Sequence, residues 1–374
     1  MDVKLGYKQT DVGIVPDDWE VTTIGDLAPL QRGFDLPTSQ LEEGSYPVVY
    51  SNGVVNYHKV PMVKGPGVVT GRSGTLGKVH FVEVDYWPHN TSLWVTKFNN
   101  NDPRFIYYLY GFVGFERFAS GSGVPTLNRN DAHSFHVATP STRSEQNVIA
   151  EALSDADAYI ESLELLIAKK RLIKQGTMQE LFDREDGRIT KELGEICTIS
   201  KERFDPSLSV TEKKCIELEH ISSGTGRLLG YFTTQGLRSQ KTVFRQGDVL
   251  FGKLRPYLRK FWFASFDGVC STELWVMKPN PGIVSGWLYW LIQTDRVLSE
   301  ANKSTGTKMP RAEWATVKKT VILVPSKVSE QVAVAEILSN MDAEIASLET
   351  KLYKTRQIKL GMMQELLTGR IRLI

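Results

Sequence analysis

Apolar residues recur at alternating spacings of four and three along two segments of the chain, a period that predicts two long helices. The first segment carries this seam at Ile149, Leu153, Ala156, Ile160, Leu163 and Ile167, and the second carries it at Val334, Leu338, Met341, Ile345, Leu348 and Leu352. Such a seam is typical of a coiled coil. A helix over 144–182 would be about 58 Å long, at roughly 1.5 Å per residue.

The two helical segments are copies of one another. Residues 140–181 align with residues 325–366 without a gap, at a constant offset of 185, and more than half of the aligned residues are identical. Pro140 and Pro325 precede the two helices, and proline suits a strand end or the approach to a helix. We therefore expect the joints between globular and helical parts at these prolines.

Local signals differ between the two copies. Thr142 and Glu145 have the spacing of a capping box at the start of the first helix, whereas the second copy has Lys327 in place of Thr142. Gly176 and Gly361 occupy equivalent positions late in the helices, where glycine costs about 1 kcal/mol relative to alanine. Either each helix frays or ends at its glycine, or another backbone approaches closely there.

The remaining parts of the repeat match more weakly, and their offset drifts. The run 24–27 corresponds to 193–196 at an offset of 169, and the residues around Trp94 correspond to those around Trp275 at 181. At an offset of 182, the matched pairs are Tyr107 with Tyr289, Leu109 with Leu291, and Arg129 with Arg311. Insertions therefore concentrate in the first half of each globular part.

Each globular part combines predicted strands with predicted helices. Short β-rich runs at 47–50, 67–70 and 79–82 are bounded by Gly, Asn and Pro, which predicts strands. The segments 105–118 and 286–299 are expected to be helical. Each part is thus a mixed α/β domain of about 140 residues, a normal domain size. The predicted organisation is a first domain over 1–140, a central helix over 141–184, a second domain over 185–325 and a C-terminal helix over 326–374.

The two kinds of segment have diverged to different extents. The helices have stayed alike, whereas the globular domains have changed both residues and length. Helices held alike suggest two equivalent docking sites. Diverged domains suggest two different ways of reading a related ligand.

Composition narrows the class of protein. Hydrophobic residues make up 41% of the chain, and no run approaches the roughly 20 apolar residues of a membrane span. The cysteines Cys197, Cys215 and Cys270 are scattered, which argues against a disulfide framework or zinc site and fits a reducing cytoplasm. The net charge of +2 neither requires nor excludes nucleic acid, so such a partner must be argued from local clusters.

Catalytic and cofactor motifs are missing from the sequence. The segment GRSGTLGKV resembles a phosphate loop, but five residues separate Gly71 from Gly77, and valine follows the lysine where Ser or Thr is required. His133 and His136 are the only closely spaced histidines, and neither has a partner at metal-ligand spacing. We therefore expect no metal site and no enzymatic activity of this chain's own.

Basic side chains beside glycines and aromatic residues form the candidate functional feature. The segment GKLRPYLRK at 252–260 places four cations within eight residues. Glycine lets a backbone approach phosphate closely, and lysine or arginine neutralises its charge. Arginine and asparagine can also bind base edges. The expected DNA-binding residues are Arg72, Ser73, Thr75, Lys78, Asn128, Arg129, Arg238, Lys241, Lys253, Arg255, Tyr257, Arg259, Lys308 and Arg311. For each residue alone, the alternative is an ordinary solvated surface position.

These motifs, in this order and duplicated, carry a family resemblance. They are GYKQTDVGIVPDDWEV, GRSGTLGKV, GVPTLNRND, GDVLFGKLRPYLRKF, the Pro…Ser-Glu-Gln helix entries, and the endings MQELF and MQELLTGRIRL. The chain resembles the specificity subunit of type I restriction–modification systems across essentially its whole length. One departure is that the first domain's loop has far fewer cations than GKLRPYLRK.

The resemblance implies an α+β fold with two target-recognition domains, each reading one half of a split, asymmetric site in double-stranded DNA. The two helices would pair as an antiparallel coiled coil, set the spacer length, and dock two copies of a methyltransferase subunit. A restriction–translocation subunit would join this cytoplasmic complex. S-adenosylmethionine, ATP and magnesium would be bound by those partners, and none by this chain.

Two alternatives remain open at this point. The chain could be an interaction scaffold whose coiled coil links two protein-binding domains, because unequal divergence of the domains suits that role as well. It could also be the recognition subunit of a different type of restriction enzyme. The target bases and the spacer length do not follow from the sequence.

Overall fold

The computed structural model describes residues 5–121, 125–209, 211–303 and 309–373. The chain divides into two compact units: unit 1 comprises Met1–Glu164 with Thr350–Ile374, and unit 2 comprises Leu165–Glu349. Each unit combines one globular domain with half of each long helix, whereas the sequence predicted the helices as separate segments. The helix halves belong to the units because their apolar residues enter the domain cores.

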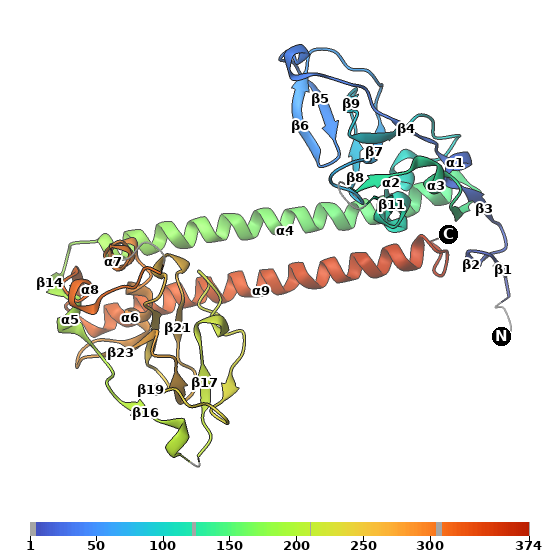
Figure 1. The fold of residues 1–374 in the computed structure, drawn as a ribbon. Helices are drawn as coiled ribbons and strands as arrows, with labels where there is room; N and C mark the ends of the chain where they lie inside the picture. Colours follow the sequence, from blue (N-terminus) through green and yellow to red (C-terminus); the bar gives the residue numbers. More distant parts are fainter. Residues whose placement is uncertain (1–4, 122–124, 210, 304–308, 374) are drawn as a thin grey trace. The chain divides into compact units, whose positions relative to one another are not determined.

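The globular part of unit 1 is built on two sheets (Figure 1). An antiparallel four-stranded sheet has the order β4–β10–β7–β8, and helix α2 packs against β7 and β8. A three-stranded sheet has the order β6–β5–β9. The bounds are β4 (Leu30–Arg32), β5 (Tyr46–Tyr50), β6 (Gly53–His58), β7 (Gly67–Gly71), β8 (Val79–Val82), β9 (Trp87–Pro88), β10 (Ser92–Val95) and α2 (Pro103–Val113). The predicted strands at 47–50, 67–70 and 79–82 are confirmed as β5, β7 and β8.

Smaller elements complete unit 1. β1 pairs with β2 in a hairpin, and β3 pairs with β13, which places Trp19 opposite Pro140. The short helices α1 and α3 contact each other beside this pair. The bounds are β1 (Tyr7–Thr10), β2 (Gly13–Pro16), β3 (Trp19–Thr23), α1 (Ile24–Leu27), η1 (Thr38–Gln40), η2 (Phe115–Phe118), β11 (Ala119–Ser120), β12 (Thr126–Leu127), α3 (Arg129–His133) and β13 (His136–Pro140).

Unit 2 repeats this framework. Its four-stranded sheet has the order β15–β23–β20–β21, and its second sheet has the order β16–β19–β22–β17–β18. The pair β14–β24 corresponds to β3–β13. The bounds are β14 (Arg188–Glu192), α5 (Leu193–Ile196), β15 (Cys197–Ile199), β16 (Arg203–Phe204), η3 (Pro206–Leu208), β17 (Lys214–Ile216), η4 (Leu218–His220), β18 (Phe232–Thr233), β19 (Lys241–Phe244), β20 (Val249–Gly252), η5 (Pro256–Leu258), β21 (Phe261–Phe263), β22 (Gly268–Cys270), β23 (Leu274–Pro279), α6 (Ser285–Leu291), α7 (Asp295–Asn302), α8 (Trp314–Val317) and β24 (Val321–Pro325).

The second sheets account for the largest change of offset in the repeat, from 169 to 181. This sheet has three strands in unit 1 and five in unit 2, whereas the four-stranded sheets keep one order. The predicted helices at 105–118 and 286–299 are each interrupted. α2 ends where Gly114 adopts a φ of 70°, which favours glycine, and α6 is separated from α7 at Thr294, whose hydroxyl donates to Leu291 O (2.7 Å).

The long helices are α4 (Arg143–Asp183) and α9 (Val328–Leu366). In unit 1, the start of α4 packs with the end of α9 in one core, and in unit 2 the end of α4 packs with the start of α9. The ten predicted seam positions are buried or half-buried: Ile149, Leu153, Ile160, Leu163, Ile167, Val334, Leu338, Ile345, Leu348 and Leu352.

Ion pairs show the direction of helix pairing within each unit. In unit 1, Asp157 pairs with Lys359 and Glu164 with Arg356. In unit 2, Lys174 pairs with Asp342 and Arg171 with Glu349. Residue numbers fall along one helix as they rise along the other, so the pairing is antiparallel in both units. Each unit 1 pair is the repeat equivalent of a unit 2 pair, at the offset of 185.

Neither helix ends at its late glycine, and no backbone of the described chain approaches there. α4 continues beyond Gly176, and α9 continues beyond Gly361. A Cβ atom added at either glycine would meet nothing within 4 Å among the described residues. Each glycine therefore costs its helix about 1 kcal/mol relative to alanine with no compensating contact inside the described chain.

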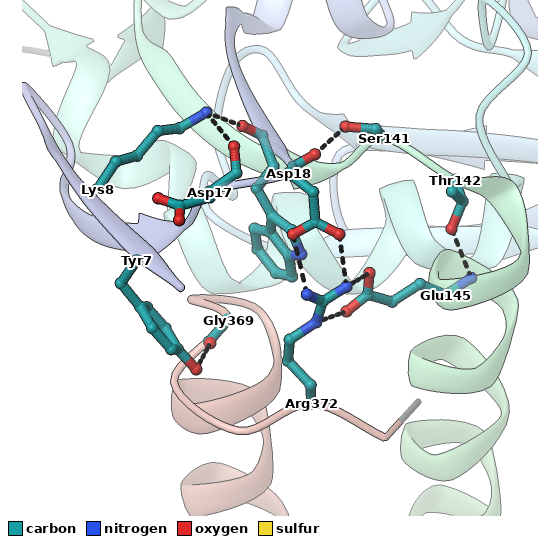
Figure 2. A network of polar contacts seen from close by, with 10 residues as sticks. Tyr7, Lys8, Asp17, Asp18, Ser141, Thr142, Glu145, Gly369 and Arg372 are labelled. Atoms are coloured by element: carbon teal, nitrogen blue, oxygen red, sulfur yellow. Dashed lines mark hydrogen bonds and ion pairs between the residues drawn. The ribbon is translucent and has the colours of Figure 1, made fainter. Parts of the chain in front are cut away.

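A polar network joins the start of α4 to the segment after α9 in unit 1 (Figure 2). The Arg372 guanidinium donates to both carboxylate oxygens of Glu145 (2.9 and 2.8 Å) and to both of Asp18 (2.9 Å each). This contact holds the pKa of Asp18 below its ordinary value. The predicted capping box is half confirmed: Thr142 Oγ1 accepts from Glu145 N (3.3 Å), but Arg372 engages the Glu145 carboxylate.

Candidate nucleic-acid interface

The first candidate loop, Arg72–Lys78, connects β7 and β8 and is held by its neighbours. The backbone N–H groups of Arg72 and Ser73 donate to Thr91 O (2.9 and 3.1 Å), and Leu127 N donates to Arg72 O (2.8 Å). The turn is tight, because a Cβ atom on Gly71 would lie 1.9 Å from the carbonyl oxygen of Thr75. The loop therefore has a fixed backbone that presents its side chains.

A row of polar side chains lies beside this loop. Arg72 Nε donates to the backbone oxygen of Asn90 (3.0 Å), and the Asn90 side-chain amide donates to the carboxylate of Asp35. Asp35 also pairs with Arg32 at 3.4 Å, and both side chains are more than half exposed. Sequence reasoning missed Arg32, Asp35 and Asn90. Asn90 directly precedes Thr91, whose backbone oxygen supports the loop, but neither residue carries the glycine or cation by which the loops were found.

The second candidate loop connects β20 and β21 in unit 2, and Lys253 has the two backbone supports that Arg72 has in unit 1. Lys253 N donates to Glu273 O (3.0 Å), Ala312 N donates to Lys253 O (2.8 Å), and Arg255 N donates to Pro310 O (2.7 Å). Arg255 and Arg259 both have a φ of 51°. Left-handed backbone is uncommon for arginine and is often stored at functional sites. The loop thus keeps two arginines in strained conformations at either end of η5.

The side chains of this second loop differ in how they are engaged. Arg255 and Tyr257 are exposed. Arg259 Nη2 donates to Gln293 O (3.0 Å), and its guanidinium lies 3.8 Å from Asp295. Arg311 Nε donates to Glu273 Oε2 at 3.1 Å, and the Arg311 side chain is about half exposed. Arg255 and Tyr257 are therefore the residues of this loop most available to a ligand.

The supports correct one match of the repeat. Leu127 N–Arg72 O in unit 1 and Ala312 N–Lys253 O in unit 2 are the same contact, so Leu127 corresponds to Ala312. Arg311 therefore corresponds to Thr126. The match of Arg129 with Arg311 is wrong, because the offset changes from 182 to 185 before this point, across the stretch that contains α7 in unit 2.

The other expected residues have mixed outcomes. Lys241 is wrong as a DNA contact: it is 6% exposed, and its Nζ pairs with Glu217 Oε1 at 2.6 Å. Asn128 caps α3, with its side-chain oxygen accepting from Asn130 N (3.0 Å). The positions Lys78, Arg129 and Arg238 are exposed, Ser73, Thr75 and Lys253 are half-buried, and Lys308 lies outside the described residues.

The two loops combine a shared backbone with different side chains. Arg72 and Lys253 are equivalent, but an asparagine and an aspartate lie beside the loop of Arg72, whereas the loop of Lys253 carries an arginine and a tyrosine and is held by Glu273, which pairs with Arg311. Such groups can neutralise phosphates and can accept from or donate to base edges. The arrangement is that of two related surfaces with different polar chemistry.

Other kinds of site find no support in the part of the chain that the structure describes. Its His, Cys, Asp and Glu side chains form no group of three or more that could hold a metal ion. The cysteines Cys197, Cys215 and Cys270 are free and buried, and burial raises their pKa. No described helix is both long and apolar enough to cross a membrane.

Comparison with known proteins identifies relatives over most of the chain. The type I restriction enzyme EcoDI specificity subunit of Escherichia coli is 24% identical over 348 residues, covering 80% of this chain and 76% of that protein. The type I restriction enzyme MjaVIII specificity subunit of Methanocaldococcus jannaschii is 22% identical, covering 96% of this chain and 94% of that protein.

Solved structures share the fold. The S subunit of the type I restriction–modification system from M. genitalium has a TM-score of 0.64 at 16% identity, with 98% of each chain covered. A chain from a structural study of complex assembly and conformational transition in the type I R-M system has a TM-score of 0.57 at 14% identity, covering 96% of this chain and 99% of that one. Residues 16–169 and 186–355 both match the model of the type I restriction modification DNA specificity domain. The chain therefore belongs to the family of type I restriction–modification DNA specificity subunits.

Proposed function

We propose that this chain recognises a split, asymmetric site in double-stranded DNA, with each domain reading one half through its candidate loop. The observation that carries this proposal is the pair of equivalent supports around Arg72 and Lys253, which hold loops of unlike side chains. A duplicated binding mode would keep the supports, and two different half-sites would require different side chains. A shared backbone with diverged chemistry satisfies both conditions.

The polar groups suggest how each half-site is read. In unit 1, Asn90, Asp35 and Arg72 lie together, and these residue types suit the edges of adenine, cytosine and guanine, respectively. In unit 2, the exposed Arg255 suits a phosphate or a guanine, and the exposed ring of Tyr257 offers apolar contact. Phosphate contacts position a protein on the duplex, and base contacts specify the sequence.

The helices supply the docking sites of this proposal. Ile173 on α4 and Ile358 on α9 are repeat equivalents, and their side chains are 44% and 63% exposed. The close sequence identity of the two helix copies, which includes these exposed isoleucines, supports two identical partners, which we take to be two methyltransferase subunits. A restriction–translocation subunit completes the proposed cytoplasmic complex. S-adenosylmethionine, ATP and magnesium are proposed to reside on these partners.

Replacing Arg255 with alanine tests the DNA-binding role. We expect weaker binding to every duplex and a salt-dependence slope reduced by about one unit if Arg255 contacts a phosphate. The measurement is the binding affinity of the complex with its methyltransferase, at several salt concentrations, for specific and unrelated duplexes. If the substitution changed the sequence preference at one base pair and left the salt-dependence slope unchanged, Arg255 would contact a base and not a phosphate.

A matched control removes the same charge elsewhere in unit 2. Arg245 lies just before β20, at the opposite end of that strand from the loop, and its side chain is 54% exposed and pairs with Glu202. Arg245→Ala should leave both affinity and salt slope unchanged. Equal losses in Arg255→Ala and Arg245→Ala would contradict a specific role for the loop.

A further inference from the structure

A lysine of α9 joins three elements in unit 1. Lys359 Nζ forms an ion pair with Asp157 of α4 and lies 5.5 Å from the ring centroid of Tyr108 on α2. The Tyr108 hydroxyl donates to the other carboxylate oxygen of Asp157 (2.9 Å). Lys359 of α9 therefore contacts both the other long helix, α4, and the domain helix α2.

The same joint occurs in unit 2 with the roles of the helices exchanged. Lys174 of α4 forms an ion pair with Asp342 of α9, and its Nζ lies 4.9 Å from a ring of Trp290 on α6. Trp290 Nε1 donates to Ser339 Oγ on α9 (3.1 Å). The repeat retains the lysine and the aspartate and keeps an aromatic residue on the domain helix, although the ring itself differs.

These joints lie partly out of solvent. Tyr108 and Trp290 are 5% and 2% exposed, and the side chains of Lys359 and Lys174 are 19% and 21% exposed. Ion pairs and cation–π contacts gain strength when they are partly removed from water. Three-way contacts of this kind resist rotation of a domain helix about the long helices more effectively than apolar contact alone, because apolar contact has no direction.

We propose that Lys359 and Lys174 are positioning residues, which fix the orientation of each recognition domain on its helix pair and thereby restrict the spacer that the protein accepts. The inference rests on the proposed function. Neither lysine lies in a candidate loop, so the effect acts through the domain helix and not through DNA contact. If a candidate loop moved by about 3.4 Å, the rise of one base pair, the protein could accept a spacer that is one base pair longer or shorter.

The experiment compares Lys359→Met and Lys174→Met with the unaltered chain in the complete methyltransferase complex. The substrates are duplexes that carry both half-sites with spacers from two base pairs shorter to two base pairs longer than the cognate one. The methylation rate at spacers one base pair off, relative to the cognate spacer, should rise about tenfold, which corresponds to roughly 1.4 kcal/mol of lost discrimination. Base preference within each half-site should not change.

Two further variants separate positioning from stability. Arg356 pairs with Glu164 between the same two helices in unit 1, and its described contacts include no residue of α2. Arg356→Met should therefore keep the original spacer profile, and Lys359→Arg should restore it. If Lys359→Met does not assemble, Tyr108→Phe removes the hydroxyl contact with Asp157 while keeping the ring, and should widen the profile to a smaller extent.

The outcomes distinguish this inference from the proposed function. An unaltered spacer profile in Lys359→Met, Lys174→Met and Tyr108→Phe, while the native chain still requires a split site, would overturn the positioning role alone. Equal widening in Arg356→Met would also overturn it. If the native complex showed no dependence on two half-sites, the proposed function itself would fail.

Discussion

Replacing Arg372 with alanine is expected to lower the free energy of unfolding of unit 1 by about 3 kcal/mol, because it leaves a buried carboxylate without its partner. The Glu145 side chain is 1% exposed, and both of its oxygens accept hydrogen bonds from Arg372 (Figure 2). Asp18 would lose the same cation. Chemical denaturation of the whole chain, followed by a probe in unit 1, measures the effect.

Arg370 provides the matched control for this prediction. Its side chain is 57% exposed and lies 3.7 Å from Glu365, and an exposed pair of this kind is worth less than about 1 kcal/mol. Adding Glu145→Gln to Arg372→Ala should recover part of the loss, because a neutral amide is less costly to bury than an unpaired charge. Equal effects of Arg370→Ala and Arg372→Ala would rule out the proposed role of the buried pair.

Inserting one heptad into both long helices is expected to lengthen the preferred spacer by about three base pairs, since seven helical residues add about 10 Å at 1.5 Å per residue. The division between the units indicates where to insert. The places between Glu164 and Leu165 and between Glu349 and Thr350 are repeat equivalents, and they separate the units without cutting either one. Seven residues also preserve the apolar seam. Methylation of duplexes with graded spacers measures the shift.

An insertion in one helix alone serves as the control. It would shift one long helix by seven residues against the other, so that the ion pairs of both units could not form together. We therefore expect loss of methylation at every spacer length. If the double insertion methylated only the original spacing, the helices would not set the distance between the readers.

The long helices were predictable because their signal is periodic and repeated. The seam positions from Ile149 onwards follow from spacing alone, and they are buried or half-buried. Strand runs such as 67–70 were found from their β-rich composition and from the Gly, Asn and Pro residues that bound them. The interruption after α2 was missed, because Gly114 occupies one position in an otherwise helical pattern, and a positive φ leaves no further trace in sequence.

Contacts between distant residues were not predictable. Arg372 meets Asp18 and Glu145 across hundreds of residues, and no local pattern pairs them. Lys359 and Asp157 had a usable signal: both are identical to their repeat equivalents although neither lies on the apolar seam. Identity at a polar position outside the seam indicates a contact that both copies need.

The candidate loops were located from sequence, but their details were not. Glycines beside cations drew attention to both loops, and each lies between two strands on equivalent supports; their contact with DNA stays a prediction. Lys241 was wrong because the burial of a lysine beside Glu217 depends on how the strands of the second sheet pack. Asn90 was missed because no cation or glycine adjoins it in sequence. Its place beside the loop depends on contacts with Arg72 and Asp35, which are distant along the chain.

The central claim is that the two domains read two different half-sites at a fixed separation. Methylome sequencing of a host that carries this chain and its methyltransferase tests it most directly. The account predicts one methylated motif in two unlike parts, separated by a spacer of constant length and indifferent sequence, that disappears when the chain is deleted. A continuous motif, or two identical half-sites, would contradict it.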